Sequence, residues 1–311
     1  MMIEASNSKL FSKNEIGLGT WSWGDKLVWG YGNKYSGKEV SEAFQEAVSL
    51  GIRFFDTAEI YGQGKSELFL GRLLPTVQEK MIVATKMMPF PWRLGKSALR
   101  KALTASLKRL GLASVDLYQM HWPMPPVKVE NWMQQMKDVF TDGLIQAVGV
   151  SNYDLELTKR SCGALEKNGI SLASNQVEYH LLERRIEKNG LLEYCRINGI
   201  KVIAYSPLAM GILTGKYSPE NPPRGARASQ YNRAYLERIQ PILKLTKKIG
   251  ADHEGKTASQ VALNWVIAKG AFPIPGAKNA DQVAQNAGAM GWKLTDEEIN
   301  KLDEASDQIR N

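Results

Sequence analysis

Residues 52–62 read Ile-Arg-Phe-Phe-Asp-Thr-Ala-Glu-Ile-Tyr-Gly. The segment begins with a short apolar run, typical of a buried strand, which ends in a carboxylate at Asp56 and is followed by Tyr61. Seven further runs rich in β-branched or aromatic residues alternate with amphipathic helical patterns, and this alternation is typical of βα units around a parallel sheet. We predict eight strands, at residues 15–20, 52–56, 81–86, 116–121, 145–151, 172–177, 201–206 and 271–275. Eight βα units favour an α/β fold of the (β/α)8 TIM barrel type over an open doubly wound sheet.

The segments between these strands carry the start signals of helices. Ser36–Glu39, Thr257–Gln260 and Thr295–Glu298 each pair a hydroxyl residue with a carboxylate or amide three positions later, which is the pattern of a capping box. A further helix is predicted from leucines at helical spacing, namely Leu99, Leu103, Leu107 and Leu110.

One connection is longer than the others, between Tyr205 and Gly276. It contains a Pro-, Gly- and Arg-rich stretch at residues 218–228, which predicts a long rim loop after the seventh strand, followed by a helix. Because no linker divides the chain, we expect a single domain over residues 1–311.

The composition excludes several classes of protein. Hydrophobic residues make up 43% of the 311 residues, which is enough for a large core and too many for a disordered chain. Two cysteines cannot form a disulfide framework, and no apolar run is long enough to cross a membrane. The N-terminus lacks the pattern of a signal peptide, so we expect a cytoplasmic protein. The net charge of +8 leaves open nucleic acid, an anionic membrane surface, an anionic ligand or a merely solvated surface.

Polar residues stand at the C-terminal ends of the predicted strands, where barrel enzymes carry their active sites. Asp56, Lys86 and His121 end three successive strands, and Tyr61 lies on the loop after Asp56. Reduction of a carbonyl needs a proton donor at its oxygen. A nearby ammonium lowers the pKa of a tyrosine, a carboxylate holds the ammonium, and an imidazole orients the carbonyl. These four residues are therefore the predicted catalytic set.

Each of the four has a structural alternative when it is considered alone. Asp56 could cap a helix, and Lys86 could be a surface residue. His121 could be a hydrogen-bonded structural histidine, and Tyr61 could be a packing aromatic. Their occurrence together at successive strand ends favours the catalytic interpretation.

Short motifs extend this pattern in order along the chain. They are residues 17–20, 55–58, 61–62, 84–86, 117–123, 149–152, 175–176, 204–208 and 274–276. With these motifs the sequence resembles the aldo-keto reductase superfamily over about residues 14–305. The resemblance implies an NAD(P)(H)-dependent oxidoreductase on this barrel. It also implies that Tyr61 is the general acid, that Lys86 and Asp56 tune it, and that His121 orients the carbonyl.

The resemblance further implies where the cofactor binds. Ser151, Asn152 and Gln176 would hydrogen-bond the nicotinamide carboxamide, and Tyr205 would stack on the ring. The backbone of residues 206–211 would approach the pyrophosphate, although its Gly211 could equally serve a simple turn. The predicted cofactor site comprises Gly19, Thr20, Trp21, Ser151, Asn152, Gln176, Tyr205, Ser206, Pro207, Leu208, Gly211, Lys216, Gly276, Lys278, Gln282, Gln285 and Asn286.

The adenosine end decides between the two nicotinamide cofactors. Lys278 precedes a predicted helix, where it could bind a 2′-phosphate, and an ordinary surface lysine is the alternative. Many relatives carry Arg in place of Gln282 and Glu in place of Gln285. We predict NADPH, with NADH left open. Further cations that could meet the dinucleotide are Lys216, Arg224 and Arg227.

Aromatic residues crowd the loops predicted to form the barrel rim. The predicted substrate wall suits a flat or apolar aldehyde and consists of Trp23, Trp29, Trp92, Trp122 and Met124. Core packing is the alternative for Trp122, as it is for Trp21. Segments 19–24, 27–31 and 91–94 are similar to plant pyridoxal-reductase-like members of the superfamily, which makes pyridoxal a candidate substrate.

Motifs for other chemistries are incomplete. No Gly-x-Gly-x-x-Gly follows a strand, and Gly64–Ser66 resembles a P-loop but has Glu59 where that motif requires glycine. The three histidines lack metal-ligand spacing, so we predict no metal.

The alternative function is a redox-sensing regulatory subunit, like the potassium-channel β-subunits of the superfamily. Basic residues are dispersed, which argues against nucleic acid. We expect a small carbonyl substrate as partner and neither nucleic acid nor a membrane. The sequence leaves monomer and homo-oligomer open.

Overall fold

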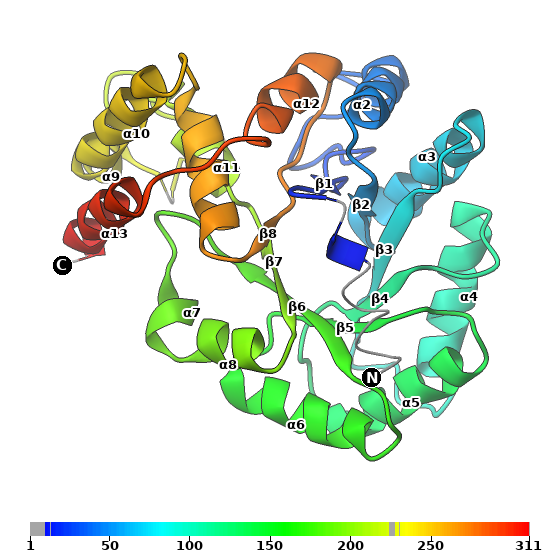
Figure 1. Ribbon diagram of the computed structural model, residues 1–311. Coiled ribbons are helices and arrows are strands. Elements are labelled where there is room, and N and C mark those ends of the chain that lie inside the picture. The colour runs from blue at the N-terminus through cyan, green and yellow to red at the C-terminus, as the bar shows by residue number, and fades with distance from the viewer. Residues whose placement is uncertain (1–9, 13, 224–227, 230, 311) are drawn as a thin grey trace.

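The computed structural model describes residues 10–12, 14–223, 228–229 and 231–310, in which eight parallel strands form one sheet in the order β1 to β8 (Figure 1). The strands are β1 (Leu18–Gly19), β2 (Phe54–Asp56), β3 (Ile82–Met87), β4 (Leu117–Met120), β5 (Val148–Ser151), β6 (Leu172–Glu178), β7 (Lys201–Tyr205) and β8 (Phe272–Pro273). The N–H groups of Gly17 and Gly19 donate to the carbonyl oxygens of Pro273 and Pro275, at 3.0 and 3.1 Å, and close the sheet. The predicted (β/α)8 barrel is confirmed, and the single-domain organisation of residues 1–311 stays a prediction.

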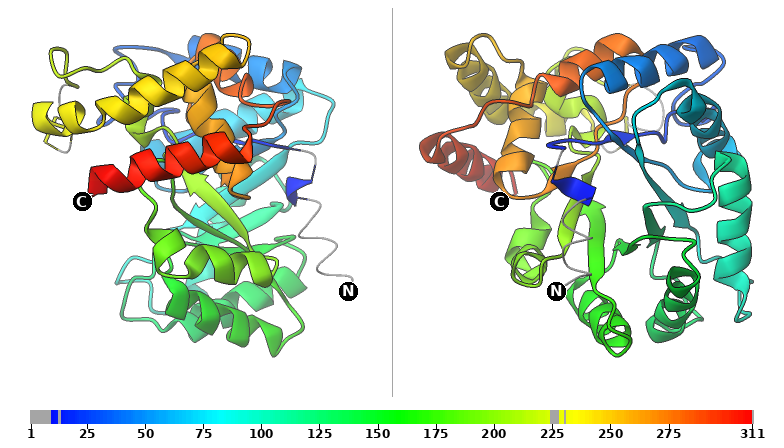
Figure 2. Two further views of the ribbon diagram at one scale, coloured as in Figure 1. Left: turned by 60° about the vertical axis from the view of Figure 1, so that its left-hand side comes forward. Right: turned by 45° about the vertical axis from the view of Figure 1, so that its right-hand side comes forward.

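Helices surround the barrel (Figure 1 and Figure 2). The α-helices are α2 (Gly37–Ser49), α3 (Lys65–Leu73), α4 (Ala98–Leu110), α5 (Val129–Thr141), α6 (Leu155–Glu166), α7 (Arg185–Lys188), α8 (Leu191–Ile197), α9 (Arg233–Arg238), α10 (Gln240–Asp252), α11 (Ala258–Ala268), α12 (Ala280–Ala287) and α13 (Asp296–Arg310). Short 3-10 turns are η1 (Tyr61–Gly64), η2 (Leu74–Thr76) and η3 (Ala209–Thr214). All three predicted capping boxes form, before α2, α11 and α13.

The segment after β7 is more helical than predicted. The sequence predicted one long loop followed by a helix, whereas η3, α9, α10 and α11 all lie between β7 and β8. Asn232 caps α9, because its side chain accepts a hydrogen bond from the Tyr235 N–H at 2.9 Å. Helix α10 then buries an apolar stripe that includes Ile242 and Ile249. Arg224 and Arg227, predicted as cofactor contacts, lie outside the described residues.

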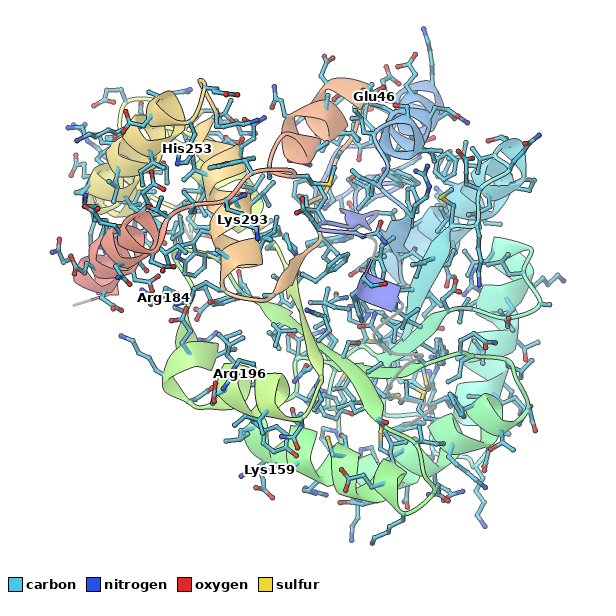
Figure 3. The ribbon with its side chains drawn as sticks, viewed as in Figure 1. Glu46, Lys159, Arg184, Arg196, His253 and Lys293 are labelled. Atoms are coloured by element: carbon cyan, nitrogen blue, oxygen red, sulfur yellow. The ribbon has the colours of Figure 1, made fainter. Side chains whose placement is uncertain are left out.

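Charged side chains are distributed over the outer helices. Figure 3 places Glu46 on α2 at one side of the barrel, and Lys159 on α6 and Arg196 on α8 at another. Among the described residues, no helix combines the length and the apolar character needed to cross a membrane.

Aromatic side chains fill the barrel at the N-terminal ends of its strands. The rings of Phe54 and Phe272 have centroids 5.0 Å apart, and Phe11 packs against both, at 5.6 and 5.2 Å. These rings belong to an apolar cluster with members from most of the strands. The main cavity lies at the opposite end, where the strands end.

Replacement of Phe54 by alanine should lower the free energy of unfolding by about 3–5 kcal/mol, because it deletes a fully buried ring and leaves a cavity. Denaturant titration of the variant and the wild type measures the difference. Leu27→Ala is the control, since Leu27 is 94% exposed. Equal stability of Phe54→Ala and wild type would contradict the role of the aromatic cluster.

Candidate active site

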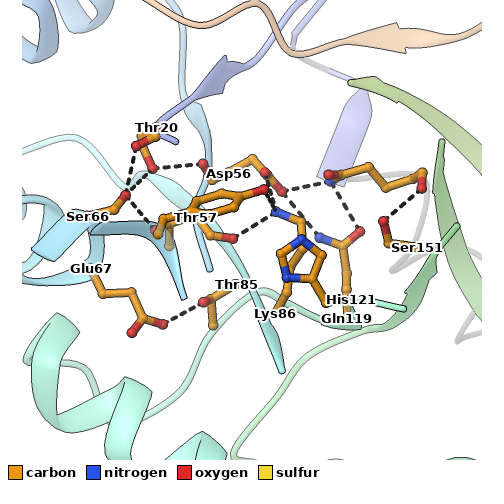
Figure 4. A network of polar contacts seen from close by, with 12 residues as sticks. Thr20, Asp56, Thr57, Ser66, Glu67, Thr85, Lys86, Gln119, His121 and Ser151 are labelled. Carbon is orange, nitrogen blue, oxygen red and sulfur yellow. Dashed lines mark hydrogen bonds and ion pairs between the residues drawn. The ribbon is translucent and has the colours of Figure 1, made fainter. Parts of the chain in front are cut away.

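A buried ion pair lies at the centre of the barrel (Figure 4). Lys86 Nζ from β3 lies 2.5 Å from Asp56 Oδ1 at the end of β2, and it also donates to Thr57 O at 2.9 Å. The second carboxylate oxygen, Oδ2, accepts hydrogen bonds from Gln176 Nε2 at 2.8 Å and from Gln119 Nε2 at 3.3 Å. Both charges are therefore compensated although the two side chains are almost fully buried.

Gln119 is a member of this site that the sequence analysis missed. It stands in β4 two residues before His121. Successive side chains of a strand point to opposite faces, so Gln119 shares the inward face with His121. This two-residue periodicity is the signal that could have identified it.

Tyr61 covers the ion pair from the loop after β2. Its hydroxyl accepts a hydrogen bond from Lys86 Nζ at 3.3 Å. Its ring stacks on Trp21 with centroids 6.0 Å apart, and the His121 ring lies edge-on at 5.5 Å. The structure thus brings the four predicted catalytic residues together.

Burial dominates the electrostatics of Tyr61. Desolvation raises the pKa of its phenol, the Lys86 charge lowers it and the Asp56 charge raises it, so that the pKa lies above the ordinary value. The predicted lowering of this pKa by the ammonium is present, but the desolvation of the hydroxyl, which the sequence does not report, outweighs it. Burial lowers the pKa of Lys86, but the charges and hydrogen bonds of Asp56 and Tyr61 together raise it by more, so Lys86 keeps its proton.

His121 lies beside the phenol in its neutral form. Burial and, to a smaller extent, the Lys86 charge lower its pKa to about 3. Its Nδ1 is buried and has no hydrogen-bond partner among the described residues. Its carbonyl oxygen accepts a hydrogen bond from Asn152 Nδ2 at 3.0 Å, which ties the ends of β4 and β5 together.

Four residues predicted to hold the nicotinamide form one wall beside His121, namely Ser151, Asn152, Gln176 and Tyr205. Asn152 has a left-handed backbone with φ of 62°, and its amide also donates to Ser151 Oγ at 3.1 Å. Asn152 Oδ1 accepts a hydrogen bond from the Tyr205 hydroxyl at 2.9 Å, while Ser151 Oγ donates to Gln176 O at 2.9 Å. These bonds fix the polar groups of β5, β6 and β7 in one surface.

This wall belongs to a cavity of about 840 Å³. The cavity extends from Tyr61 and His121 past Tyr205 to the start of α12. Among the described residues, it is lined by every predicted cofactor residue except Thr20. Thr20 is buried beneath it, where its hydroxyl donates to Asp56 O at 2.9 Å. Wall residues that were not predicted from the sequence include Ser22, Ile60, Thr214 and Ser259.

Three of the five predicted substrate-wall residues do not line the cavity. Trp23 is fully buried in the core, and its Nε1 donates to Ala277 O at 3.0 Å. Trp92 is 73% exposed and stacks on Phe90, with ring centroids 4.6 Å apart, outside the cavity. Met124 is also absent from the wall, whereas Trp29 and Trp122 line it.

The shape and polarity of the cavity fit a dinucleotide. Ser206, Ala209, Met210 and Gly211 all have positive φ, between 48° and 94°, and this backbone lies at the cavity between its two ends. A left-handed backbone of this kind brings main-chain groups rather than long side chains towards a ligand. The segment therefore suits the pyrophosphate part of the cofactor.

Lys278 is held at the wall of the cavity. Its Nζ donates to Trp29 O at 3.3 Å and lies over the rings of Trp29 and Tyr35, at 4.9 and 5.2 Å from their centroids. Its N–H donates to Gln282 Oε1 at 3.0 Å, next to the N-terminus of α12. The ammonium is therefore positioned by several contacts, unlike that of an ordinary surface lysine. A cation at a helix N-terminus suits a phosphate.

Comparison with known proteins identifies the family. The sequence profile of the Aldo/keto reductase family matches residues 15–307. The chain belongs to the aldo/keto reductase family. It is therefore an oxidoreductase, and the family predicted from the motifs is confirmed.

Three relatives show how far the similarity extends. The chloroplastic pyridoxal reductase of Arabidopsis thaliana is 38% identical, covering 95% of this chain and 84% of the relative. A putative voltage-gated potassium channel subunit beta of Schizosaccharomyces pombe is 31% identical, covering 88% and 86%. The crystal structure of an aldo-keto reductase from Klebsiella pneumoniae in complex with NADPH is 30% identical, with a TM-score of 0.70, covering 93% and 90%.

The imidazole of His121 should stay neutral from about pH 8 down to about pH 4, because its pKa is lowered to about 3. Nitrogen-edited NMR of the side chain follows the protonation, with His121→Asn to assign the signal. The unfolded chain takes up this proton near pH 6.5 and the folded chain does not, so His121 reduces stability as the pH falls below that value. An imidazolium signal from His121 at about pH 6 would contradict the predicted environment.

Proposed function

We propose that this protein reduces an aldehyde or ketone to the alcohol with NADPH. One observation carries the proposal: the Tyr61 hydroxyl lies on a buried Lys86–Asp56 ion pair, beside a neutral His121, at one end of a cavity that suits a dinucleotide. When bound, NADPH supplies the hydride. The side chains of the site hold the substrate and donate the proton.

In the proposed reaction, the Tyr61 hydroxyl donates its proton to the carbonyl oxygen. Its raised pKa keeps the phenol protonated at neutral pH until the carbonyl oxygen of the substrate becomes basic. The Lys86 ammonium at 3.3 Å stabilises the phenolate that remains, and Asp56 keeps that ammonium in place. The neutral imidazole of His121 orients the carbonyl and stabilises the charge developing on its oxygen.

The proposed cofactor contacts follow the cavity wall. Ser151, Asn152 and Gln176 hold the carboxamide, and Tyr205 stacks on the nicotinamide. Lys278 binds the 2′-phosphate and favours NADPH over NADH. The NADPH complex of the Klebsiella relative supports this choice.

For the substrate we propose pyridoxal or another flat, apolar aldehyde. The cavity around Tyr61 is lined by Trp21, Trp29, Ile60 and Trp122, which suit a planar ring. The name of the Arabidopsis relative supports pyridoxal. A cytoplasmic location belongs to the same proposal.

A regulatory role is the second candidate. The potassium channel subunit beta relative favours it, and the same four residues would then report the redox state of the bound cofactor. Turnover would be slow with every carbonyl, and exposed apolar residues such as Leu27 and Leu94 would serve to contact a partner protein. Rapid turnover of pyridoxal would exclude this alternative.

Tyr61→Phe should lower kcat by about 10²–10⁴-fold and leave the Kd of NADPH unchanged, because only the proton donor is lost. NADPH absorbance measures turnover with pyridoxal and with a panel of other aldehydes and ketones. Tyr118→Phe is the matched control, since Tyr118 is buried and its hydroxyl has no partner among the described residues. Full activity of Tyr61→Phe would refute the mechanism. Turnover of other aldehydes without pyridoxal would remove pyridoxal from the proposal.

Lys278→Met should raise the Kd of NADPH by about 10- to 100-fold and leave that of NADH nearly unchanged, because a charge-assisted contact to the 2′-phosphate is worth about 1.5–3 kcal/mol. Fluorescence titration gives both constants without turnover. Lys293→Met is the control, because Lys293 is exposed and does not line the cavity. An equal rise in the Kd of NADPH and of NADH would show that Lys278 does not bind the 2′-phosphate.

A further inference from the structure

A second ion pair lies next to the site, and the proposed mechanism does not use it. Glu59 lies between Asp56 and Tyr61 on the loop after β2, and its side chain is only 8% exposed. Arg93 comes from the loop after β3. Its Nη1 lies 2.5 Å from Glu59 Oε1, and its Nη2 lies 3.1 Å from Oε2. Glu59 and Arg93 thus form a two-point pair, the Glu59–Arg93 clamp.

The clamp joins the two segments that supply Tyr61 and Lys86. The Glu59 N–H donates to Lys86 O at 3.3 Å, and Glu59 Oε1 accepts from the Met88 N–H at 2.7 Å. Arg93 Nη1 donates to Met88 O at 2.9 Å, so the side chains of both clamp residues bind the main chain of Met88, two residues after Lys86. The guanidinium also lies over the Phe90 ring, 5.4 Å from its centroid, which fixes Arg93 from a second side.

The Tyr61 hydroxyl itself is weakly anchored. Within the described residues, its one hydrogen bond is the 3.3 Å contact with Lys86 Nζ. The next residues, Gly62 and Gln63, have left-handed φ values of 56° and 58°. Apart from the contacts of its ring with Trp21 and His121, the position of the phenol therefore depends on how the loop after β2 is held against the end of β3.

We propose that Glu59 and Arg93 are positioning residues that align the Tyr61 hydroxyl with the Lys86 ammonium. The inference rests on the proposed function, since alignment matters only if Tyr61 donates a proton. Neither residue lines the cavity, so both act through the backbone of the two loops. A displacement of about 1 Å in such a constellation can cost about 10²-fold in rate.

Four variants separate positioning from simple stability. Arg93→Met leaves the buried Glu59 carboxylate without its cation, so both melting temperature and kcat should fall. Arg93→Lys keeps the positive charge but loses the two-point geometry of the guanidinium. Its melting temperature and kcat should therefore lie between those of the wild type and Arg93→Met. Glu59→Gln removes the carboxylate. The double variant Glu59→Gln/Arg93→Met is neutral, so its melting temperature should recover while kcat stays at least about tenfold below wild type.

The measurements are kcat and KM for pyridoxal, the Kd of NADPH, and hydrogen–deuterium exchange of residues 57–64 and 86–93. In Arg93→Met, kcat should fall by about 10- to 100-fold, with KM and Kd changed by less than about threefold. Exchange should rise by about tenfold in these two segments and remain unchanged elsewhere. Arg160→Met is the matched control, because Arg160 makes a two-point pair with Glu130, at 2.8 and 3.0 Å, between α5 and α6 and away from the cavity.

Recovery of both kcat and melting temperature in the double variant would overturn the proposal, because the pair would then only avoid an unpaired charge. Unchanged exchange in Arg93→Met would overturn it as well, whether or not the enzyme turns over. A wild type that reduces no carbonyl would instead refute the proposed function, and the exchange data would still decide whether the clamp holds the two loops together.

Discussion

The ion pair between Lys86 and Asp56 is the interaction on which the rest of the site depends. Removing two charges from water is costly, and an ion pair in the interior offsets that cost only when its remaining hydrogen-bonding capacity is also satisfied. Here Thr57 O accepts from the ammonium, and Gln119 and Gln176 donate to the carboxylate. The pair therefore requires β2, β3, β4 and β6 to meet at one point. Closure of the barrel by hydrogen bonds between β8 and the β1 segment brings the strand ends together in this way.

The ion pair also affects the protonation of two neighbouring groups, His121 and Tyr61, in different ways. Its ammonium disfavours a second positive charge, which together with burial keeps His121 neutral. The same ammonium favours a negative charge on the phenol, although burial keeps that phenol protonated. A proton donor needs both properties, since it must hold its proton before the reaction and be stabilised after losing it. The site obtains them from one lysine and from exclusion of water.

The sequence predicted the barrel and the strand-end residues Asp56, Lys86 and His121 because these depend on regular strands, whereas Tyr61, on the loop after β2, was predicted from its closeness in sequence to Asp56. A strand end fixes where a side chain lies, and the types of residue at successive ends then indicate the chemistry. In irregular loops, the sequence alone does not fix where a side chain lies. Trp23 and Trp92 both lie in loops rich in Gly and Pro, yet one is buried in the core and the other faces solvent. The sequence predicted the lowering effect of Lys86 on the Tyr61 pKa but not the larger effect of burial, since burial is a property of the whole fold and local sequence does not report it. Gln119 was missed although its two-residue spacing from His121 indicated the inward face.

The net charge of +8 does not show which cations a ligand can meet, because that depends on where each side chain lies. Lys86 is fully buried and paired, so it adds nothing to the field that a ligand meets at a distance. Lys278 lies at the cavity wall, where two aromatic rings and a carbonyl oxygen hold its ammonium. An aromatic face attracts a cation and leaves its charge in place. The ammonium of Lys278 is thus held at the wall of the cavity, whereas that of Lys86 is enclosed with Asp56. Where each lysine lies in the fold therefore decides its use.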